Sequence, residues 1–146
     1  MFRGGREEAD ANTYADGLEL KPRDGPANDY VSVKVAGESQ YQESLRQICG
    51  RKGDEAIRLE GKRAMLVPEP DNPHDPCAVR VEIDGMTVGY MSRGNARRYH
   101  KRVAAMIEDG EEPVVDSWIG CHGPGAENPN IGVRLKIPRD SRLEQT

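Results

Sequence analysis

The stretch 68–76 concentrates the side chains of this chain that could do chemistry. Between its four prolines lie two kinds of polar group, carboxylates and nitrogen-bearing side chains: Glu69, Asp71, Asn72, His74 and Asp75. Because proline fixes its own φ and restricts the residue before it, this loop has little conformational freedom. A stiff loop that displays such groups is suited to recognising a ligand.

Two other interpretations of the loop stay open. Hard cations bind clustered oxygens, so Glu69, Asp71 and Asp75 with His74 could hold a divalent metal, although their spacing matches no EF-hand loop. Asp and Asn before proline also stabilise turns through their own backbone. Of the three interpretations we favour ligand recognition, and we expect no metal or other cofactor.

A second candidate is a run of cations near residue 100. Arg93, Arg97 and Lys101 fall four apart and therefore share one face of a helix, with Arg98 and Arg102 in a second row. Few acids interrupt the run, so ion pairs along the helix do not account for it. Such a row could contact phosphates with salt-dependent affinity, whereas the plainer interpretation is a solvated helix face.

Aromatic rings provide the third group of candidates. Exposed rings on small barrels stack on the bases of single strands without reading their sequence. Tyr41 and Tyr90 flank the stiff loop and are the best candidates for this role. We expect Tyr99, which falls in the apolar stripe of its helix, and Trp118 to lie in the core.

The elements that must position these groups are mostly short strands. Residues 77–83 alternate apolar and polar, Asp84-Gly85 is a preferred tight-turn dipeptide, and residues 86–90 alternate back, which predicts a hairpin. Further strands are predicted at 31–35, 62–67, 114–119 and 131–137, helices at 38–49 and 92–109, and a loop or poor strand at 51–61. This order predicts a mainly β protein with two helices (α+β), built as a small, OB-like, partly closed antiparallel β-barrel.

Length and composition bound the rest. The 146 residues allow one domain, which we place at 30–138, between a flexible arm at 1–29 and a polar tail at 139–146. No run approaches the ~20 apolar residues of a membrane span. Three widely spaced cysteines without a CxxC pair favour small buried thiols in a reducing cytoplasm. The net charge of −4 means that any nucleic-acid contact must come from a local basic patch.

With these motifs the chain resembles the HIRAN domain family. The resemblance covers about 31–137 and lies in Val35 to Gln42 (VAGESQYQ), Leu66 to Pro76 (LVPEPDNPHDP) with Ala78-Val79, Asp84-Gly85, Val88-Gly89-Tyr90 and Gly132 to Leu135 (GVRL). It implies a compact OB-like barrel, found fused to SNF2-type helicases that remodel stalled replication forks and as stand-alone bacterial or phage proteins. In the best-understood members of the family this barrel captures the 3′ end of single-stranded DNA.

Carried onto this sequence, the resemblance implies a role for most of the candidates. Asp75 would accept a hydrogen bond from the terminal 3′-hydroxyl. Tyr41 would stack on a base, and His74 would take the position of a family aromatic that touches the terminal nucleotide. Asn72 would orient the loop, Tyr90 would line the DNA path, and Arg93 would meet a phosphate. The chain has Ser39-Gln40 where helicase-type members carry Arg-Tyr, and it contains no GxxxxGK[ST] motif for an ATP-driven motor.

The sequence therefore predicts a non-catalytic module that grips single-stranded DNA, at a 3′ end, in DNA repair, replication or phage–host defence. Tyr41, Asn72, His74, Asp75, Tyr90, Arg93, Arg97 and Lys101 are the expected binding residues. The alternative is a protein-interaction module whose acidic arm and loop dock a nuclease, a helicase or a host factor. A metal-dependent nuclease would need a base and a second carboxylate cluster, and the sequence shows neither.

Overall fold

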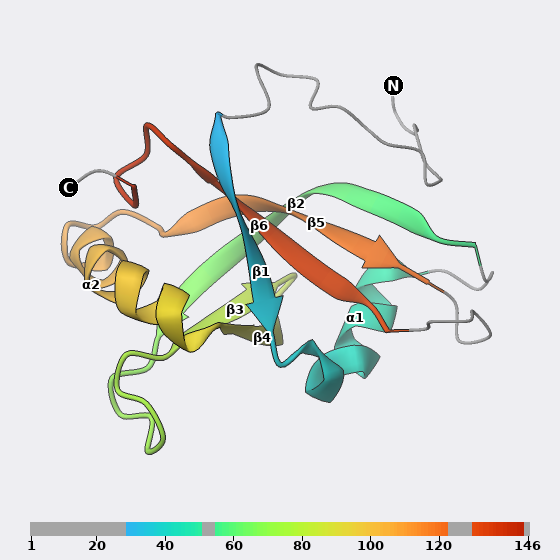
Figure 1. Cartoon of the computed structure of the whole chain (residues 1–146), viewed down its shortest axis with the longest axis horizontal. Helices are drawn as coiled ribbons and strands as arrows, with labels where there is room; N and C mark the ends of the chain where they lie inside the picture. Colours follow the sequence, from blue (N-terminus) through green and yellow to red (C-terminus); the bar gives the residue numbers. More distant parts are fainter. Residues whose placement is uncertain (1–28, 51–54, 123–129, 145–146) are drawn as a thin grey trace.

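Six antiparallel strands close into a barrel in the computed structural model of the chain, which describes residues 29–50, 55–122 and 130–144. The strands are β1 (Tyr30–Ala36), β2 (Ile57–Pro68), β3 (Val79–Ile83), β4 (Met86–Met91), β5 (Val114–Cys121) and β6 (Gly132–Pro138). They follow each other around the barrel as β1-β4-β3-β2-β5-β6 (Figure 1). The prediction of a small, mainly antiparallel barrel with two helices is confirmed. The barrel is closed, where the sequence predicted partial closure.

Helices lie at the two ends of the barrel (Figure 1). The predicted first helix is divided into a 3₁₀ turn, η1 (Glu38–Tyr41), and an α-helix, α1 (Gln42–Cys49). The second helix, α2 (Arg93–Glu108), begins after Ser92, whose hydroxyl accepts a hydrogen bond from the Asn95 N–H and so caps the helix as expected.

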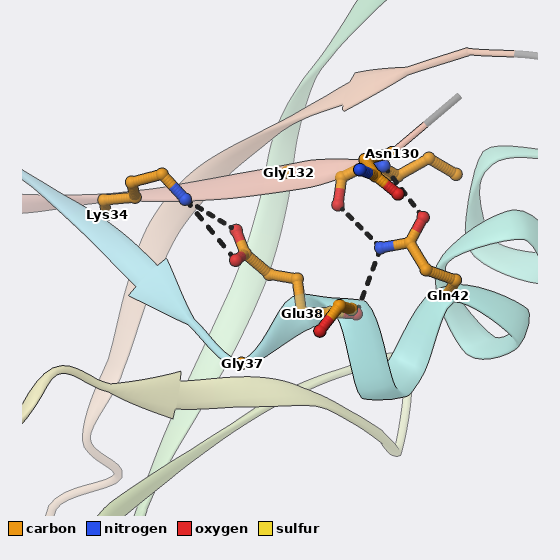
Figure 2. A pocket seen from close by; sticks show the side chains of 8 residues that line it. Lys34, Gly37, Glu38, Gln42, Asn130 and Gly132 are labelled. Atoms are coloured by element: carbon orange, nitrogen blue, oxygen red, sulfur yellow. Dashed lines mark hydrogen bonds and ion pairs between the residues drawn. The ribbon is translucent and has the colours of Figure 1, made fainter. Parts of the chain in front are cut away.

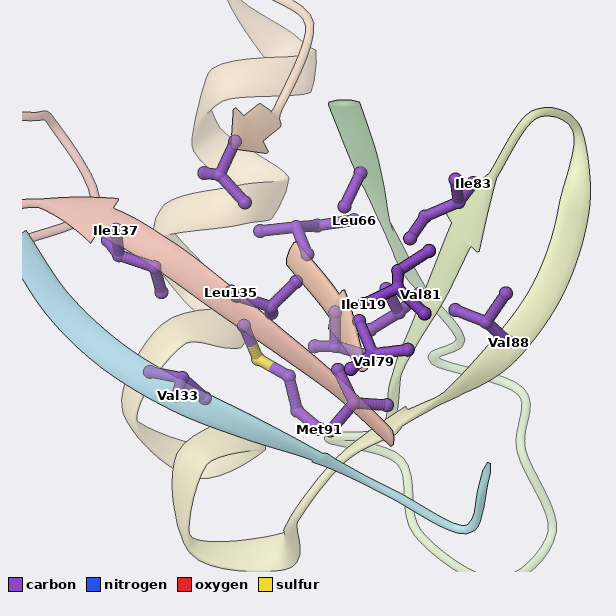
Figure 3. Close-up of a cluster of buried hydrophobic side chains, with 14 of the residues drawn as sticks. Val33, Leu66, Val79, Val81, Ile83, Val88, Met91, Ile119, Leu135 and Ile137 are labelled. Carbon is purple, nitrogen blue, oxygen red and sulfur yellow. The ribbon is translucent and has the colours of Figure 1, made fainter. Parts of the chain in front are cut away.

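The core fills the barrel with the inward residues of every strand (Figure 3). Val79, Val81 and Ile83 alternate along β3, and Leu135 and Ile137 point inward from β6, all of them buried. Tyr99 on α2 is fully buried, as predicted. The Asp84-Gly85 turn has positive φ at both residues (54° and 78°), which the hairpin prediction requires.

Three features of the fold correct the sequence analysis. The segment expected to be a loop or poor strand at 51–61 belongs from Ile57 onward to β2, which bends at a bulge between Glu60 and Lys62. Cys49 of α1 and Cys121 of β5 form a disulfide, so they are not free buried thiols, and only Cys77 is free. Because disulfides persist in oxidising compartments, the cysteines no longer support the expectation of a reducing cytoplasm.

Trp118 is the third correction. It does not lie in the core but on the outward side of β5, half-buried, between the buried Ser117 and Ile119. Ser117 takes the inward position because its hydroxyl donates a hydrogen bond to the Lys62 carbonyl (2.8 Å).

The segment after β6 packs against α2 rather than extending away from it. Leu143 is buried at 2% exposure. The Arg102 guanidinium donates to the Leu143 carbonyl, and the Glu144 carboxylate accepts hydrogen bonds from Arg98 and from the Tyr99 hydroxyl. Burial, together with the bond to Glu144, raises the pKa of Tyr99 to about 12. The second row of helix cations therefore holds this segment in place.

Two parts of the chain lie largely outside the described residues. The arm at 1–29 is described only at Asp29, and the loop after β5 is not described over 123–129. Within the described ranges no helix is long and apolar enough to cross a bilayer.

Candidate nucleic-acid interface

The loop between β2 and β3 is held in shape by its own polar side chains. The Asn72 side-chain oxygen accepts hydrogen bonds from the N–H groups of His74 (2.8 Å) and Asp75 (3.1 Å). The Asp75 Oδ1 accepts one from the Cys77 N–H (2.9 Å). These are the turn-stabilising bonds that Asn and Asp make, so turn chemistry explains part of the loop's composition.

Glu69 joins the loop to the neighbouring strands. Its carboxylate accepts hydrogen bonds from the Asn72 amide (2.9 Å), the Arg80 guanidinium (2.5 Å) and the Tyr90 hydroxyl (3.1 Å). Burial raises the pKa of Glu69, but these three bonds and the charge of Arg80 outweigh that effect and hold the pKa below its usual value. The sequence analysis gave Glu69 no structural role, and Arg80 was not a candidate at all.

Tyr90 lies between the hydrogen bonds of Glu69 and the ring of Tyr41, the other candidate for stacking on a base. Its pKa is raised, first by burial, then by its hydrogen bond to Glu69 and the charge of that carboxylate, and also by the field of Tyr41. Tyr90 is the Cα partner of Ala36 on β1, and η1, which carries Tyr41, contacts β4. Both rings are half-buried rather than interior. The two tyrosines therefore lie on one side of the barrel, beside the loop.

Gly89 allows β1 to come this close to β4. A Cβ built at Gly89 would lie 2.5 Å from Cγ1 of Val35 and 2.7 Å from the Ala36 carbonyl oxygen. Contacts shorter than 3.0 Å are essentially never seen for real Cβ atoms. Glycine at this position is thus a geometric requirement for placing η1 next to Tyr90.

Asp75 and Arg93 bring the loop and α2 together. The Arg93 Nε lies 3.9 Å from Asp75 Oδ2, with the arginine side chain 68% exposed and the aspartate side chain 20% exposed. Oδ1 is occupied by the Cys77 N–H, so Oδ2 is the oxygen that faces Arg93 and the solvent. His74 is exposed on the same loop.

Arg97 and Lys101 continue from Arg93 along α2, one turn apart, and both are exposed. No carboxylate within the described part of the chain forms an ion pair with either of them. The structure therefore brings Asn72, His74, Asp75 and Arg93 together, places Tyr41 beside Tyr90, and leaves the first row of helix cations open to solvent.

A small polar pocket opens on the other side of η1 (Figure 2). It has a volume of about 310 Å³ and is lined by residues of β1, η1, α1 and the start of β6, including Lys34, Glu38 and Gln42. The buried Glu38 carboxylate accepts from the Val133 N–H (3.1 Å) and lies 3.4 Å from Lys34 Nζ. The Gln42 amide bridges both backbone groups of Ile131 (2.9 and 3.0 Å). The sequence analysis did not identify this pocket.

No group of three or more His, Cys, Asp and Glu side chains that could hold a metal ion occurs in the described ranges. The donor set of the loop fits a metal poorly, because Glu69 is engaged by Arg80 and one oxygen of Asp75 by a backbone N–H.

Comparison with known protein families and with curated proteins found no match. Among solved structures, the chain is similar to the crystal structure of the HIRAN domain of human HLTF. The two share 15% identity over 77% of this chain and 79% of that chain, with a TM-score of 0.35.

Proposed function

We propose that this chain is a non-catalytic module that binds single-stranded DNA at its 3′ end. The observation that carries the proposal is the pairing of Asp75 and Arg93 at the mouth of the stiff loop. A 3′-terminal nucleotide offers a hydroxyl that donates a hydrogen bond and, one step away, a phosphate that accepts one. A carboxylate oxygen beside a guanidinium matches both groups.

Rings and further cations would supply the rest of the affinity. Tyr41 and the exposed His74 stack on bases, and each stacked base contributes ~1–3 kcal/mol. Arg97 and Lys101 follow Arg93 along α2 and contact successive phosphates. Tyr90 lines the path and keeps its hydroxyl on Glu69. The roles in DNA repair, replication or phage–host defence, and a helicase or nuclease as protein partner, belong to the same proposal.

Fluorescence polarisation with strands that differ only at the 3′ terminus tests the proposal. Asp75→Asn keeps an oxygen for the Cys77 N–H and removes the charge, so it separates recognition from folding. We expect it to weaken binding to a 3′-hydroxyl strand about 10-fold, because a hydrogen bond to a charged group is worth roughly 1.5 kcal/mol or more. Binding to a 3′-phosphorylated strand should change little. Equal losses on both strands would remove the hydroxyl role of Asp75.

Salt dependence separates this function from a protein-interaction module, which the net charge of −4 favours. For single strands, log K falls against log salt by about 0.7 for each phosphate contact. Arg93→Gln should therefore reduce the slope by about 0.7, whereas Arg142→Gln, on a cation already paired with Asp109 and Glu111, should leave it unchanged. Tight binding of a protein partner without any affinity for DNA would favour the rival.

A further inference from the structure

A second surface of the barrel carries cations and two aromatic rings, Trp118 and Tyr30, that the terminal site does not use. Lys34 of β1 is the Cα partner of Arg134 of β6, and Arg134 is the partner of Trp118 of β5. Directly paired residues on neighbouring strands point to the same side of a sheet. The neighbours of these residues along each strand are buried, so the row faces outward. We call this surface the barrel-face patch: Lys34, Arg58, Trp118, Arg134 and Lys136.

The half-buried ring of Trp118 has the Arg58 guanidinium over it. The Arg58 guanidinium lies 3.9 Å from the ring centroid, and Gly120 lies beside the ring, where an added Cβ would meet it at 3.7 Å. The Arg58 Nε is 2.6 Å from Glu60 but lacks hydrogen-bond geometry, so charge alone holds it there. An aromatic ring with an adjacent arginine is the arrangement on which single-stranded nucleic acids stack.

The charge of the patch is opposite to that of the whole chain. Its four cations face three carboxylates. Glu60 pairs with Arg58 and Lys136, Glu38 lies 3.4 Å from Lys34, and Asp116, the Cα partner of Lys136, pairs with Arg63. The one hydrogen bond that Arg134 makes to a described residue is a long one to the Ser32 hydroxyl (3.4 Å). The Lys34 side chain is 64% exposed. A net positive row in a chain of net charge −4 favours an extended anionic partner.

Strand β1 makes the patch continuous with the terminal site. Ala36 pairs with Tyr90, and Lys34 lies two residues earlier on the same side of β1. The distance along the surface from β4 to β5, across β1 and β6, is three strand spacings, or roughly 14 Å. The polar pocket lies between the two regions and is lined by Lys34 as well as by residues of η1 (Figure 2). A strand leaving Tyr41 and Tyr90 thus meets cations and then a ring.

We propose that the barrel-face patch binds a segment of the DNA single strand that lies farther from the 3′ end than the nucleotides held at Tyr41, Arg93, Arg97 and Lys101. Trp118 stacks on a base of that segment, and Lys34, Arg134 and Lys136 contact its phosphates. The inference rests on the proposed single-strand-binding function, but it does not depend on recognition of the terminus.

Trp118 itself reports on the proposal, because it is the sole tryptophan of the chain. Unlabelled strands of about 4 and about 12 nucleotides, which span the site sizes of such barrels, are titrated into the full chain while tryptophan emission is followed. We expect the longer strand to quench Trp118 and the shorter one to leave it nearly unchanged. Unchanged emission with the longer strand at saturation would overturn the stacking role.

Affinity variants complete the test. Trp118→Leu should weaken binding of the longer strand at least about 5-fold, the low end for one lost stacked base, with the shorter strand unaffected. Arg134→Gln, which alters only an exposed head group, should reduce the salt slope for the longer strand by about 0.7, whereas Arg142→Gln should not. The proposal would be overturned if neither Trp118→Leu nor Arg134→Gln changed the affinity for the longer strand. The proposal would also be overturned if this chain formed a dimer that Arg134→Gln dissociates, because the patch would then be an interface between copies.

The outcomes also separate this inference from the function on which it rests. If Asp75→Asn fails to distinguish the two termini but the longer strand still quenches Trp118, the terminal site is refuted and the patch stands. If Asp75→Asn distinguishes them and the patch variants have no effect, the patch is refuted alone. Absence of any DNA binding would refute both.

Discussion

Replacing Gly89 with alanine should separate the two halves of the candidate site. The new Cβ would lie 2.5 Å from a methyl group of Val35 and 2.7 Å from the Ala36 carbonyl oxygen. Val35 is fully buried and cannot move aside without disturbing the core, and the carbonyl belongs to the backbone of β1. The strand itself must therefore shift away from β4.

The expected cost follows from these contacts. Inserting one methyl group into a packed interior costs roughly 1–3 kcal/mol. The register between β1 and β4 comprises only two Cα pairs, Val35 with Met91 and Ala36 with Tyr90. Loss of one of their hydrogen bonds would add roughly 1 kcal/mol. We expect the free energy of unfolding to fall by about 2–4 kcal/mol, measured by urea denaturation with Trp118 emission as the signal.

Gly94→Ala is the matched control. Gly94 lies in the first turn of α2, and a Cβ there would meet nothing within 4 Å. Alanine is the better helix former, so this variant should be as stable as the original chain, or more stable by up to about 1 kcal/mol. Equal changes in stability for Gly89→Ala and Gly94→Ala would refute the close approach of β1 to β4. With the approach intact, Gly89→Ala should also weaken single-strand binding, because it displaces η1 from Tyr90.

Three further predictions concern what holds the site in place. Because the pKa of Glu69 is lowered in the folded chain, its charge contributes stability at neutral pH that is lost as the pH falls through that pKa. Glu69→Gln should therefore lower the free energy of unfolding, measured by urea denaturation, by roughly 1.5–3 kcal/mol at neutral pH and by much less in acid. Reducing the disulfide, which joins residues 72 apart, should cost about 2–4 kcal/mol, and Cys77→Ser should not alter that loss. Leu143→Ala should lower the free energy of unfolding by roughly 2–5 kcal/mol if its segment belongs to the core, and by almost nothing if it is a tail.

Strands and helices could be predicted where the apolar–polar pattern of the sequence matches the side of the element that is buried. Strand β3 alternates strictly, and the Asp84-Gly85 turn has few alternatives, so the hairpin was evident from the sequence. The closeness of Asp75 and Arg93 was not visible in any pattern. It was expected only through resemblance to a family, and the structure places the two side chains 3.9 Å apart.

The predictions that failed have a common cause: contacts between residues far apart in the sequence determined these features. The inward side of β5 contains Ser117, which is buried through its bond to the Lys62 carbonyl, so hydrophobicity alone placed Trp118 on the wrong side. The disulfide depends on the end of α1 meeting the end of β5, which only the barrel topology brings about. Leu143 is one apolar residue in a polar segment, and no periodicity could reveal that it docks on α2.

The partners of the loop carboxylates fit the strand terminus that we propose better than a metal. Glu69 is surrounded by three donors that fix the loop and Tyr90, so a cation could bind it only by displacing Arg80. Asp75 gives one oxygen to the Cys77 N–H and turns the other toward Arg93. Asp71 is exposed, and in the described ranges no three or more His, Cys, Asp and Glu side chains come together to hold a metal ion. In the function that we propose, the Asp75 oxygen beside Arg93 accepts a hydrogen bond from one hydroxyl, which is followed by a phosphate.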